Sequence, residues 1–275
     1  MSTPDQTLLN DKAVALNAWL QHGSLQEAMV HVKESIRSRP GNIRERWLFF
    51  QLACLLGDWD RALKQLQGCA QIDPEREQIA QVMRGLIRSE VLRAEVLNGK
   101  NTPGYVIDQP PAWVLLLLEA LRASSKGDNE LADTTRQQAL SEVLDLPGEI
   151  DGLPFAWISD TDTRLGPVCE LIVAGRYRWC PFCELSSINL NSPHGLLDLI
   201  WAKADCTLRD GSELQAYIPV RYPGSESGTD EIRLARETAW QELGTTGIVG
   251  LGQKTLMTDA GDYGLLDLRK ISFSA

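Results

Sequence analysis

Two cysteines in the stretch "GRYRWCPFCEL" have a spacing that could do chemistry. Cys180 and Cys183 form a C-x-x-C, the pattern of a redox dithiol or of half a zinc site. A redox dithiol needs a helix N-terminus to lower the thiol pKa, but "RYRWCPF" and "CELSSINL" both have the pattern of extended segments. A zinc site needs a second ligand pair, and the other cysteines stand alone at positions 54, 69, 169 and 206. We therefore predict two small residues in a β-hairpin, with a thiol or zinc function as the alternative.

A glycine-rich stretch, "GIVGLGQKT" at residues 247–255, comes close to a phosphate-binding loop. That loop requires G-x-x-x-x-G-K-[ST] between a strand and a helix. Gly247 and Gly252 match, but Gln253 occupies the lysine position and Lys254 follows one residue late. We expect no apolar strand before the stretch and no helix after it. The stretch therefore predicts a flexible or tight glycine turn.

Asp160 and Asp162 lie two residues apart and could form a metal pair. No other carboxylate cluster lies near them in the sequence, so an Asp-rich turn is the simpler interpretation. The histidines, His22, His31 and His194, have no nucleophile motif beside them, and the chain contains no G-x-S-x-G or H-E-x-x-H. We predict no catalytic residue, no metal site and no cofactor. An unrecognised metal or thiol enzyme is the least favoured alternative.

The first half of the chain has the apolar periodicity of helices. Ser24 and Asp58 follow glycines and suit helix N-caps. A loop is expected at residues 101–111. The predicted helical segments are residues 8–23, 24–40, 42–57, 58–74, 75–99, 112–127 and 128–148.

A sequence repeat underlies these helices, with a period of about 34 residues, which is that of the tetratricopeptide family. Three positions recur at that interval, since Gly23, Ala28 and Pro40 reappear as Gly57, Ala62 and Pro74. A third, less regular copy follows about two periods later. We therefore predict a tetratricopeptide-like helical repeat, with a helical bundle of chance spacing as the alternative. Stacked helix pairs leave a groove of the kind that holds peptides or helices.

After about residue 148 the pattern changes from helix to strand. Residues 194–201 and 229–240 look like short helices. The predicted extended runs, separated by Gly, Pro and Asp-Gly turns, are residues 168–182, 185–190, 204–222 and 265–273. We therefore predict an α+β protein of two domains with a boundary within residues 146–153. An all-α tetratricopeptide-like domain spans 1–148, and a small α+β domain with a bent, mainly antiparallel sheet spans 149–275.

The composition is that of an ordinary globular protein with an acidic balance. Hydrophobic residues make up 43% of the chain, and the formal charge is −10. Neither half carries a basic excess, which argues against a nucleic-acid partner. The N-terminus lacks the features of a signal peptide, and the longest apolar run, residues 112–118, is too short to span a bilayer. We expect a cytoplasmic protein with free thiols and no membrane partner.

The second half resembles a known protein family. The stretch "DTDTRLGPVCELIVAGRYRWCPF" and later stretches at 196–226, 234–240, 250–259 and 265–273 are similar to the ImpE family, also called TagJ or SciE. The resemblance covers about residues 150–275 with the segments in order, and the helical half matches more loosely. In the family motif, R-L-G-P-x-x-E followed by G-R-Y-x-W-x-P-F, the cysteine positions are variable letters. The resemblance therefore also favours an incidental C-x-x-C.

The resemblance implies an adaptor of bacterial type VI secretion and carries over no catalytic residue. Family members bind the N-terminal helix of the small contractile-sheath subunit and are linked to sheath handling with the ClpV ATPase. A general tetratricopeptide scaffold of another complex is the alternative. The polar residues that match the family motif form either a recognition surface or an internal network of Arg and aromatic contacts. They are Arg164, Arg176, Tyr177, Arg221, Tyr222, Arg236 and Gln253.

A helical partner needs a long apolar groove. The first half has an apolar surplus in "WLFFQLACLL" and "WVLLLLEAL", more than thin helices hide among themselves. We expect part of this surplus to pack on the second half and to join the two halves rigidly. The remainder predicts a groove floor around Trp47, Phe50 and Trp113.

The predicted repeat can be tested at Ala62, where it brings helices into close contact. Ala62→Leu should overpack that junction and lower the free energy of unfolding by about 1–3 kcal/mol. A thermal melt measures the change. An unchanged Tm would mean that the spacing of the repeat is coincidental.

Overall fold

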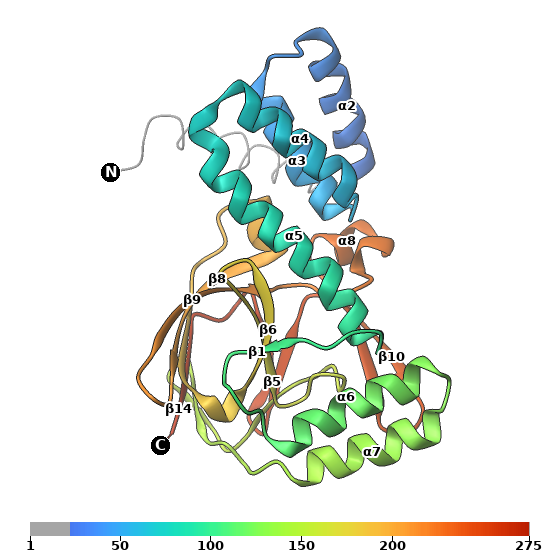
Figure 1. Ribbon diagram of the computed structural model, residues 1–275, viewed down its shortest axis with the longest axis vertical. Coiled ribbons are helices and arrows are strands. Elements are labelled where there is room, and N and C mark those ends of the chain that lie inside the picture. Colours follow the sequence, from blue (N-terminus) through green and yellow to red (C-terminus); the bar gives the residue numbers. More distant parts are fainter. Residues whose placement is uncertain (1–22, 275) are drawn as a thin grey trace.

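A computed structural model describes residues 23–274 as helices followed by a mixed β-sheet (Figure 1). The helix predicted at residues 8–23 lies outside the described residues except for its last position, and so does His22. The α-helices are α2 (Leu25–Ser38), α3 (Ile43–Leu55), α4 (Trp59–Ile72), α5 (Glu77–Leu97), α6 (Ala112–Ser125), α7 (Asn129–Ser141) and α8 (Asp230–Arg233). Short 3-10 helices are η1 (Pro74–Arg76), η2 (Phe182–Glu184), η3 (Leu196–Leu199) and η4 (Ser225–Ser227).

Side-chain caps explain where several helices begin. The Ser24 hydroxyl accepts a hydrogen bond from the N–H of Glu27, and the Glu27 carboxylate accepts one from the N–H of Ser24. Asp58 and Asp128 cap α4 and α7 by accepting from the N–H three residues on. The predicted caps at Ser24 and Asp58 are confirmed.

The alanines at the equivalent position of each copy of the sequence repeat are buried, namely Ala28, Ala62 and Ala132.

The main sheet has nine strands in the order β1-β6-β5-β9-β8-β7-β14-β2-β3, and only the β1–β6 pair is parallel. Its strands are β1 (Gly104–Tyr105), β2 (Gly148–Ile150), β3 (Leu153–Phe155), β5 (Val168–Val173), β6 (Arg176–Pro181), β7 (Leu185–Leu190), β8 (Trp201–Leu208), β9 (Glu213–Pro219) and β14 (Lys270–Phe273). Figure 1 shows the sheet strongly curved. The predicted α+β class with a bent, mainly antiparallel sheet is confirmed, although the sheet is larger than predicted.

Two smaller sheets complete the C-terminal half. β10 (Thr238–Leu243) pairs with β11 (Gly247–Gly252), and β12 (Thr255–Thr258) lies between β4 (Ile158–Asp160) and β13 (Gly261–Gly264). The glycine turn predicted at 247–255 is therefore wrong, because Gly247 to Gly252 form a paired strand. Gly250 is needed for close packing, since an added Cβ would lie 2.3 Å from the Tyr222 ring.

The two short helices predicted in the second half are only partly present. Within residues 194–201 the chain makes the 3-10 turn η3, and Trp201 already begins β8. Within residues 229–240 the helix is the four-residue α8, and Thr238 begins β10. Backbone pairing with β9 and β11 therefore overrides the local helical pattern at both places.

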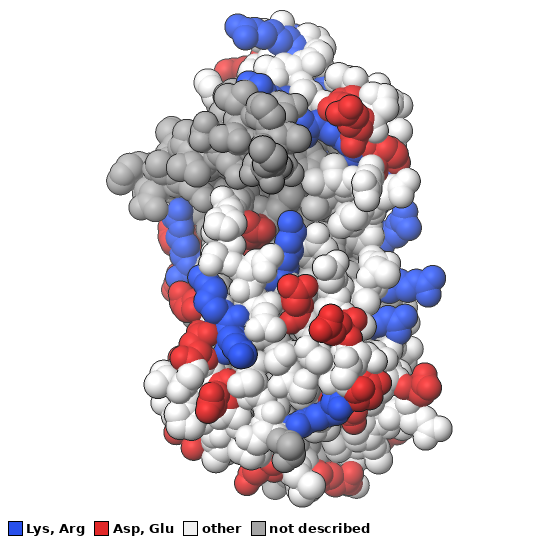
Figure 2. Space-filling view, turned by 90° about the vertical axis from the view of Figure 1, so that its left-hand side faces the viewer, with Lys and Arg blue, Asp and Glu red and all other residues white. Residues whose placement is uncertain are grey.

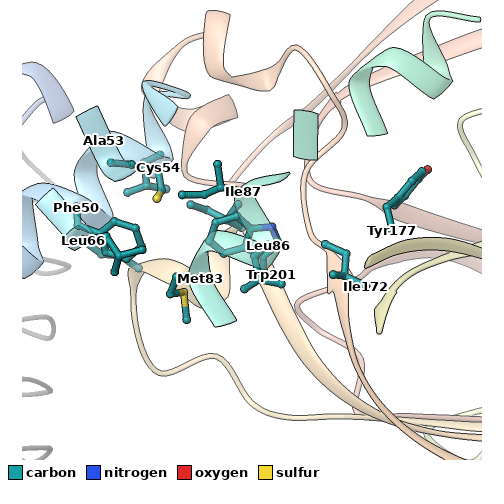
Figure 3. Packing of buried hydrophobic residues seen from close by; sticks show 14 of the residues in the cluster. Phe50, Ala53, Cys54, Leu66, Met83, Leu86, Ile87, Ile172, Tyr177 and Trp201 are labelled. Atoms are coloured by element: carbon teal, nitrogen blue, oxygen red, sulfur yellow. The ribbon is translucent and has the colours of Figure 1, made fainter. Parts of the chain in front are cut away.

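One buried apolar cluster spans both halves of the chain. Helix residues such as Phe50 and Leu86 pack in the same cluster as Ile172, Tyr177 and Trp201 of the sheet (Figure 3). A second cluster consists mainly of residues from the sheets. The apolar surplus of the first half thus packs on the second half, as predicted. Division into domains at 148 stays a prediction, because β1 from the helical half also pairs with β6.

Helix α5 runs from the helical layer onto the sheet and touches it backbone to backbone (Figure 1). A Cβ added to Gly85 would lie 2.8 Å from the Cα of Gly175, in the turn between β5 and β6. Ser89 lies one turn further along α5 and donates a hydrogen bond of 3.3 Å to the Gly175 carbonyl. Only glycine at position 85 permits this approach.

Gly85→Ala should therefore lower the free energy of unfolding by about 1–3 kcal/mol through overpacking. This loss outweighs the gain of up to about 1 kcal/mol that Ala brings over Gly inside a helix. Gly68→Ala in α4 is the matched control, because its added Cβ comes no nearer than 3.5 Å to a neighbouring atom, so this variant should be stabilised. Urea unfolding of both variants measures the difference, and shifts of the same sign would contradict the backbone contact.

Candidate functional site

The structure places the C-x-x-C cysteines where a thiolate is disfavoured. Cys180 is buried in β6 opposite Cys169 of β5, and Cys183 lies exposed on η2. Burial raises the pKa of both thiols, which is opposite to the shift that a redox dithiol needs. The predicted β-hairpin is present for Cys180, because β5 and β6 pair as one, whereas Cys183 lies beyond it on η2.

Asp160 ends β4 and Asp162 lies in the turn that follows, so the predicted Asp-rich turn is present, but the Asp160 side chain belongs to a buried polar cluster. Its carboxylate accepts hydrogen bonds from the Lys254 ammonium and from the Tyr222 hydroxyl, the latter at 2.7 Å. Lys254 Nζ also lies 3.0 Å from Glu170 Oε2. Burial raises the pKa of Asp160, and the Lys254 charge opposes that rise. Lys254, the residue one position late for a phosphate-binding loop, is thus an internal counter-ion.

Glu170 lies at the centre of the cluster. Arg93 of α5 donates two parallel hydrogen bonds to it, from Nε at 2.7 Å and from Nη2 at 2.8 Å, and Tyr177 donates a third. Burial alone raises the pKa of Glu170, but the charges of Arg93 and Lys254 outweigh burial and hold the pKa well below its usual range. The carboxylate therefore stays ionised and joins α5 to β5.

Asp162 forms a separate ion pair with Arg164, whose Nη2 lies 2.5 Å from Asp162 Oδ2. The same carboxylate accepts a hydrogen bond from the N–H of Gly250 in β11. The two aspartates of the "DTD" stretch are therefore engaged by side chains of the protein itself. Within residues 23–274, no group of three or more His, Cys, Asp or Glu side chains could hold a metal ion.

The polar residues that match the family motif are divided between interior and surface. Tyr177, Arg221 and Tyr222 are buried, Arg164 and Gln253 are partly buried, and Arg176 and Arg236 are exposed. The Arg221 guanidinium donates to the carbonyls of Cys54 and Leu55, so it caps the C-terminus of α3 from the other half of the chain. Most of the set thus makes internal contacts, and a recognition role for Arg176 and Arg236 stays a prediction.

The residues predicted to form a groove floor are mostly in the core. Trp47 is 7% exposed and Phe50 is 0% exposed, with their ring centroids 4.9 Å apart. Side chains so deeply buried pack the helical layer and do not present a surface. Trp113, also 7% exposed, is the one of the three that lines a cleft in the described structure.

This cleft, of about 1010 Å³, lies between the helical part and the sheets. Trp113 comes from α6 and Leu140 from α7, whereas Trp157, Phe182 and Phe273 come from the C-terminal half. The volume reaches the upper limit of small-molecule pockets, about 300–1,000 Å³. Of the aromatic residues in this cleft, sequence reasoning singled out only Trp113 for a groove, because the others are distant along the chain and share no common motif with it.

One wall of the cleft is the segment 142–147, which joins α7 to β2 and which we call the strap. Leu144 in the strap is 87% exposed. Glu142 and Asp145 on either side of it are exposed as well. The strap therefore adds an apolar side chain and two carboxylates to the edge of an apolar cleft.

Charged residues of both signs share the face shown in Figure 2. On the face in Figure 2, Lys and Arg side chains alternate with Asp and Glu, without a continuous basic area over the described residues. Such a face lacks the electrostatic pattern of nucleic-acid binding.

No helix within residues 23–274 is both long and apolar enough to cross a membrane.

Removing Lys254 tests the buried cluster. Lys254→Met leaves Asp160 and Glu170 short of a counter-ion and should lower the free energy of unfolding by about 3–5 kcal/mol. Lys203→Met, at an exposed position of β8, should change it by no more than about 0.5 kcal/mol. Adding Asp160→Asn to Lys254→Met should restore part of the loss, because one unpaired charge is removed. Chemical unfolding of the three variants measures these values, and a Lys254→Met variant as stable as the control would contradict the pairing.

Comparison with known proteins identifies relatives of nearly the whole chain. A family model described as ImpE protein matches residues 152–272. The chain is 40% identical over 255 residues to the type VI secretion system accessory component TagJ of Pseudomonas aeruginosa, covering 92% of this chain and 89% of that protein. The crystal structure of protein VPA1032 from Vibrio parahaemolyticus has a TM-score of 0.87, covering 94% of this chain and 97% of that chain. At 24% identity this last likeness shows the fold alone.

The resemblance seen in residues 150–275 is thus confirmed, and similarity to TagJ extends it into the helical half. Arg164, Tyr177 and Tyr222 of the shared motif take part in the internal contacts described above. The chain belongs to the ImpE family.

Proposed function

We propose that this chain is a non-catalytic accessory protein of a bacterial type VI secretion system. The observation that carries the proposal is the 40% identity to TagJ over 92% of the chain, because that relative is named as an accessory component of such a system. The chemistry of the candidate residues supports a role without catalysis. Burial raises the pKa of the Cys180 and Cys183 thiols, and the Asp160 and Asp162 carboxylates bind Lys254 and Arg164.

We propose further that the chain is an adaptor for the N-terminal helix of the small contractile-sheath subunit and assists sheath handling with the ClpV ATPase. The resemblance to the ImpE family implies this role. A helical ligand presents apolar side chains at i, i+3, i+4 and i+7, and needs an apolar groove to receive them. The cleft between the helical part and the sheets supports the proposal, since aromatic residues from both halves line it. A cytoplasmic location is part of the proposal.

A synthetic peptide of the N-terminal sheath helix, taken from the same genome, should bind the full-length chain in isothermal titration calorimetry. We expect a negative heat-capacity change, because apolar surface is buried. Weak salt dependence should accompany it, because most contacts are apolar. The full chain is the correct material, since the shared core makes each half incomplete alone.

The control is a scrambled peptide of the same composition that lacks the apolar stripe. Equal binding of both peptides, or no binding of the helical one, would count against the adaptor proposal. Co-purification of the sheath subunits with the chain from cells tests the same proposal without a peptide.

A further inference from the structure

We infer that the sheath-subunit helix docks in the cleft between the helical part and the sheets, and that the strap holds it through Leu144. This inference rests on the proposed function, since it names where the proposed partner binds. Three independent features of the cleft lead to it: the origin of its lining, the exposure of the strap, and the charge of the strap.

The lining of the cleft suits an apolar helix face. Residues of both halves line the hollow, in which Trp157 is partly exposed, whereas Trp113, Phe182 and Phe273 are only 7%, 2% and 7% exposed and close its bottom. Buried aromatic pockets at the centre of an interface are where most binding energy is concentrated. An α-helix is about 10–12 Å across with its side chains, so a hollow of about 1010 Å³ receives one face of a helix and leaves the other in solvent.

The position of Leu144 reveals no role for its side chain in the fold. Its side chain is 87% exposed, the highest value among the exposed large apolar residues of the described structure. Val143 and Pro147 are held by backbone hydrogen bonds to Leu140 and Ser274. Within residues 23–274, the backbone between these two points, residues 144–146, makes no hydrogen bond. Leu146 of the strap packs against the second apolar cluster, so the strap is a fixed edge of the cleft that leaves Leu144 exposed.

The charge of the strap specifies the chemistry of the helix. Glu142 and Asp145 are exposed beside Leu144, and neither forms a salt bridge within the described residues. The lining also contains the exposed, cationic Arg209, so complementary positive charge is expected only where a partner meets the strap. The geometry points to a helix whose apolar stripe is flanked by Lys or Arg on the side that meets the strap.

Leu144→Asp in the full-length chain is the direct test, with the synthetic sheath-helix peptide as the probe. The variant should bind the peptide about tenfold more weakly or worse, because it removes an apolar contact and adds a like charge to the acidic strap. Leu131→Asp is the matched control, since Leu131 on α7 is 53% exposed and lies outside the cleft lining. Both variants should keep the Tm of the unmodified chain. If Leu144→Asp folds poorly, Leu144→Ser takes its place with an expected loss of a few-fold.

Reversal of the strap charge tests the second part of the inference. Glu142→Lys combined with Asp145→Lys should weaken binding a few-fold at low salt and by less at high salt. Glu119→Lys combined with Glu213→Lys changes the net charge equally at exposed positions outside the cleft, and should leave binding unchanged.

The outcomes separate the docking site from the proposed function. If the peptide binds the unmodified chain and binds Leu144→Asp equally well, the cleft is not the site, although the adaptor function stands. If the peptide does not bind the unmodified chain at all, the proposed function fails and the docking inference fails with it. If sedimentation shows a dimer that Leu144→Asp dissociates, a second copy occupies the cleft, which overturns the assignment to a sheath helix.

Discussion

The buried ion pair between Arg93 and Glu170 is the contact on which the arrangement of the two halves depends. Its two parallel hydrogen bonds join the C-terminal part of α5 to β5, with both side chains almost wholly removed from solvent. A buried pair of this kind contributes little net stability, because desolvation offsets most of the attraction. It does fix geometry, since any other placement of α5 leaves two unpaired charges inside the protein. Lys254 extends the constraint to Asp160 of β4, which is an edge strand of the three-stranded sheet.

A second constraint holds the far end of the helical part. Asp133 of α7 accepts hydrogen bonds from the N–H and hydroxyl groups of both Thr245 and Thr246, at the tip of the β10–β11 hairpin. These bonds hold the pKa of Asp133 well below its usual range, so the carboxylate remains ionised and bound to the hairpin. With α5 fixed on one side and α7 on the other, the space between α6–α7 and the main sheet cannot close by sliding of the layers. The cleft lies between parts of the structure that these two attachments hold in place.

The parts that sequence could predict are those governed by local rules. Caps at Ser24 and Asp58, the strand at 176–181 and the mainly antiparallel sheet follow from short-range patterns of polarity and turn residues. Contacts between distant positions have no such pattern. In the sequence Lys254 resembles only a misplaced P-loop lysine, because its partners Asp160 and Glu170 lie far away along the chain. For the same reason the apolar stretch around Trp47 suggests a surface, although the sheet half supplies residues that complete its core.

In the proposed adaptor, the packed layers and the exposed side chains of the strap have different roles. Recognition of a helix requires a preformed apolar surface, because ordering the receptor on binding would weaken the complex. The ion network and the hairpin attachment provide that order on the layers that carry Trp113, Phe182 and Phe273. The strap lies outside both of these constraints, but Leu146 packs on the second apolar cluster, so the strap holds Leu144 exposed beside the cleft. In the proposed complex, affinity comes from the apolar side chains exposed in the cleft and specificity from Leu144 and the carboxylates of the strap, and neither needs a reactive side chain.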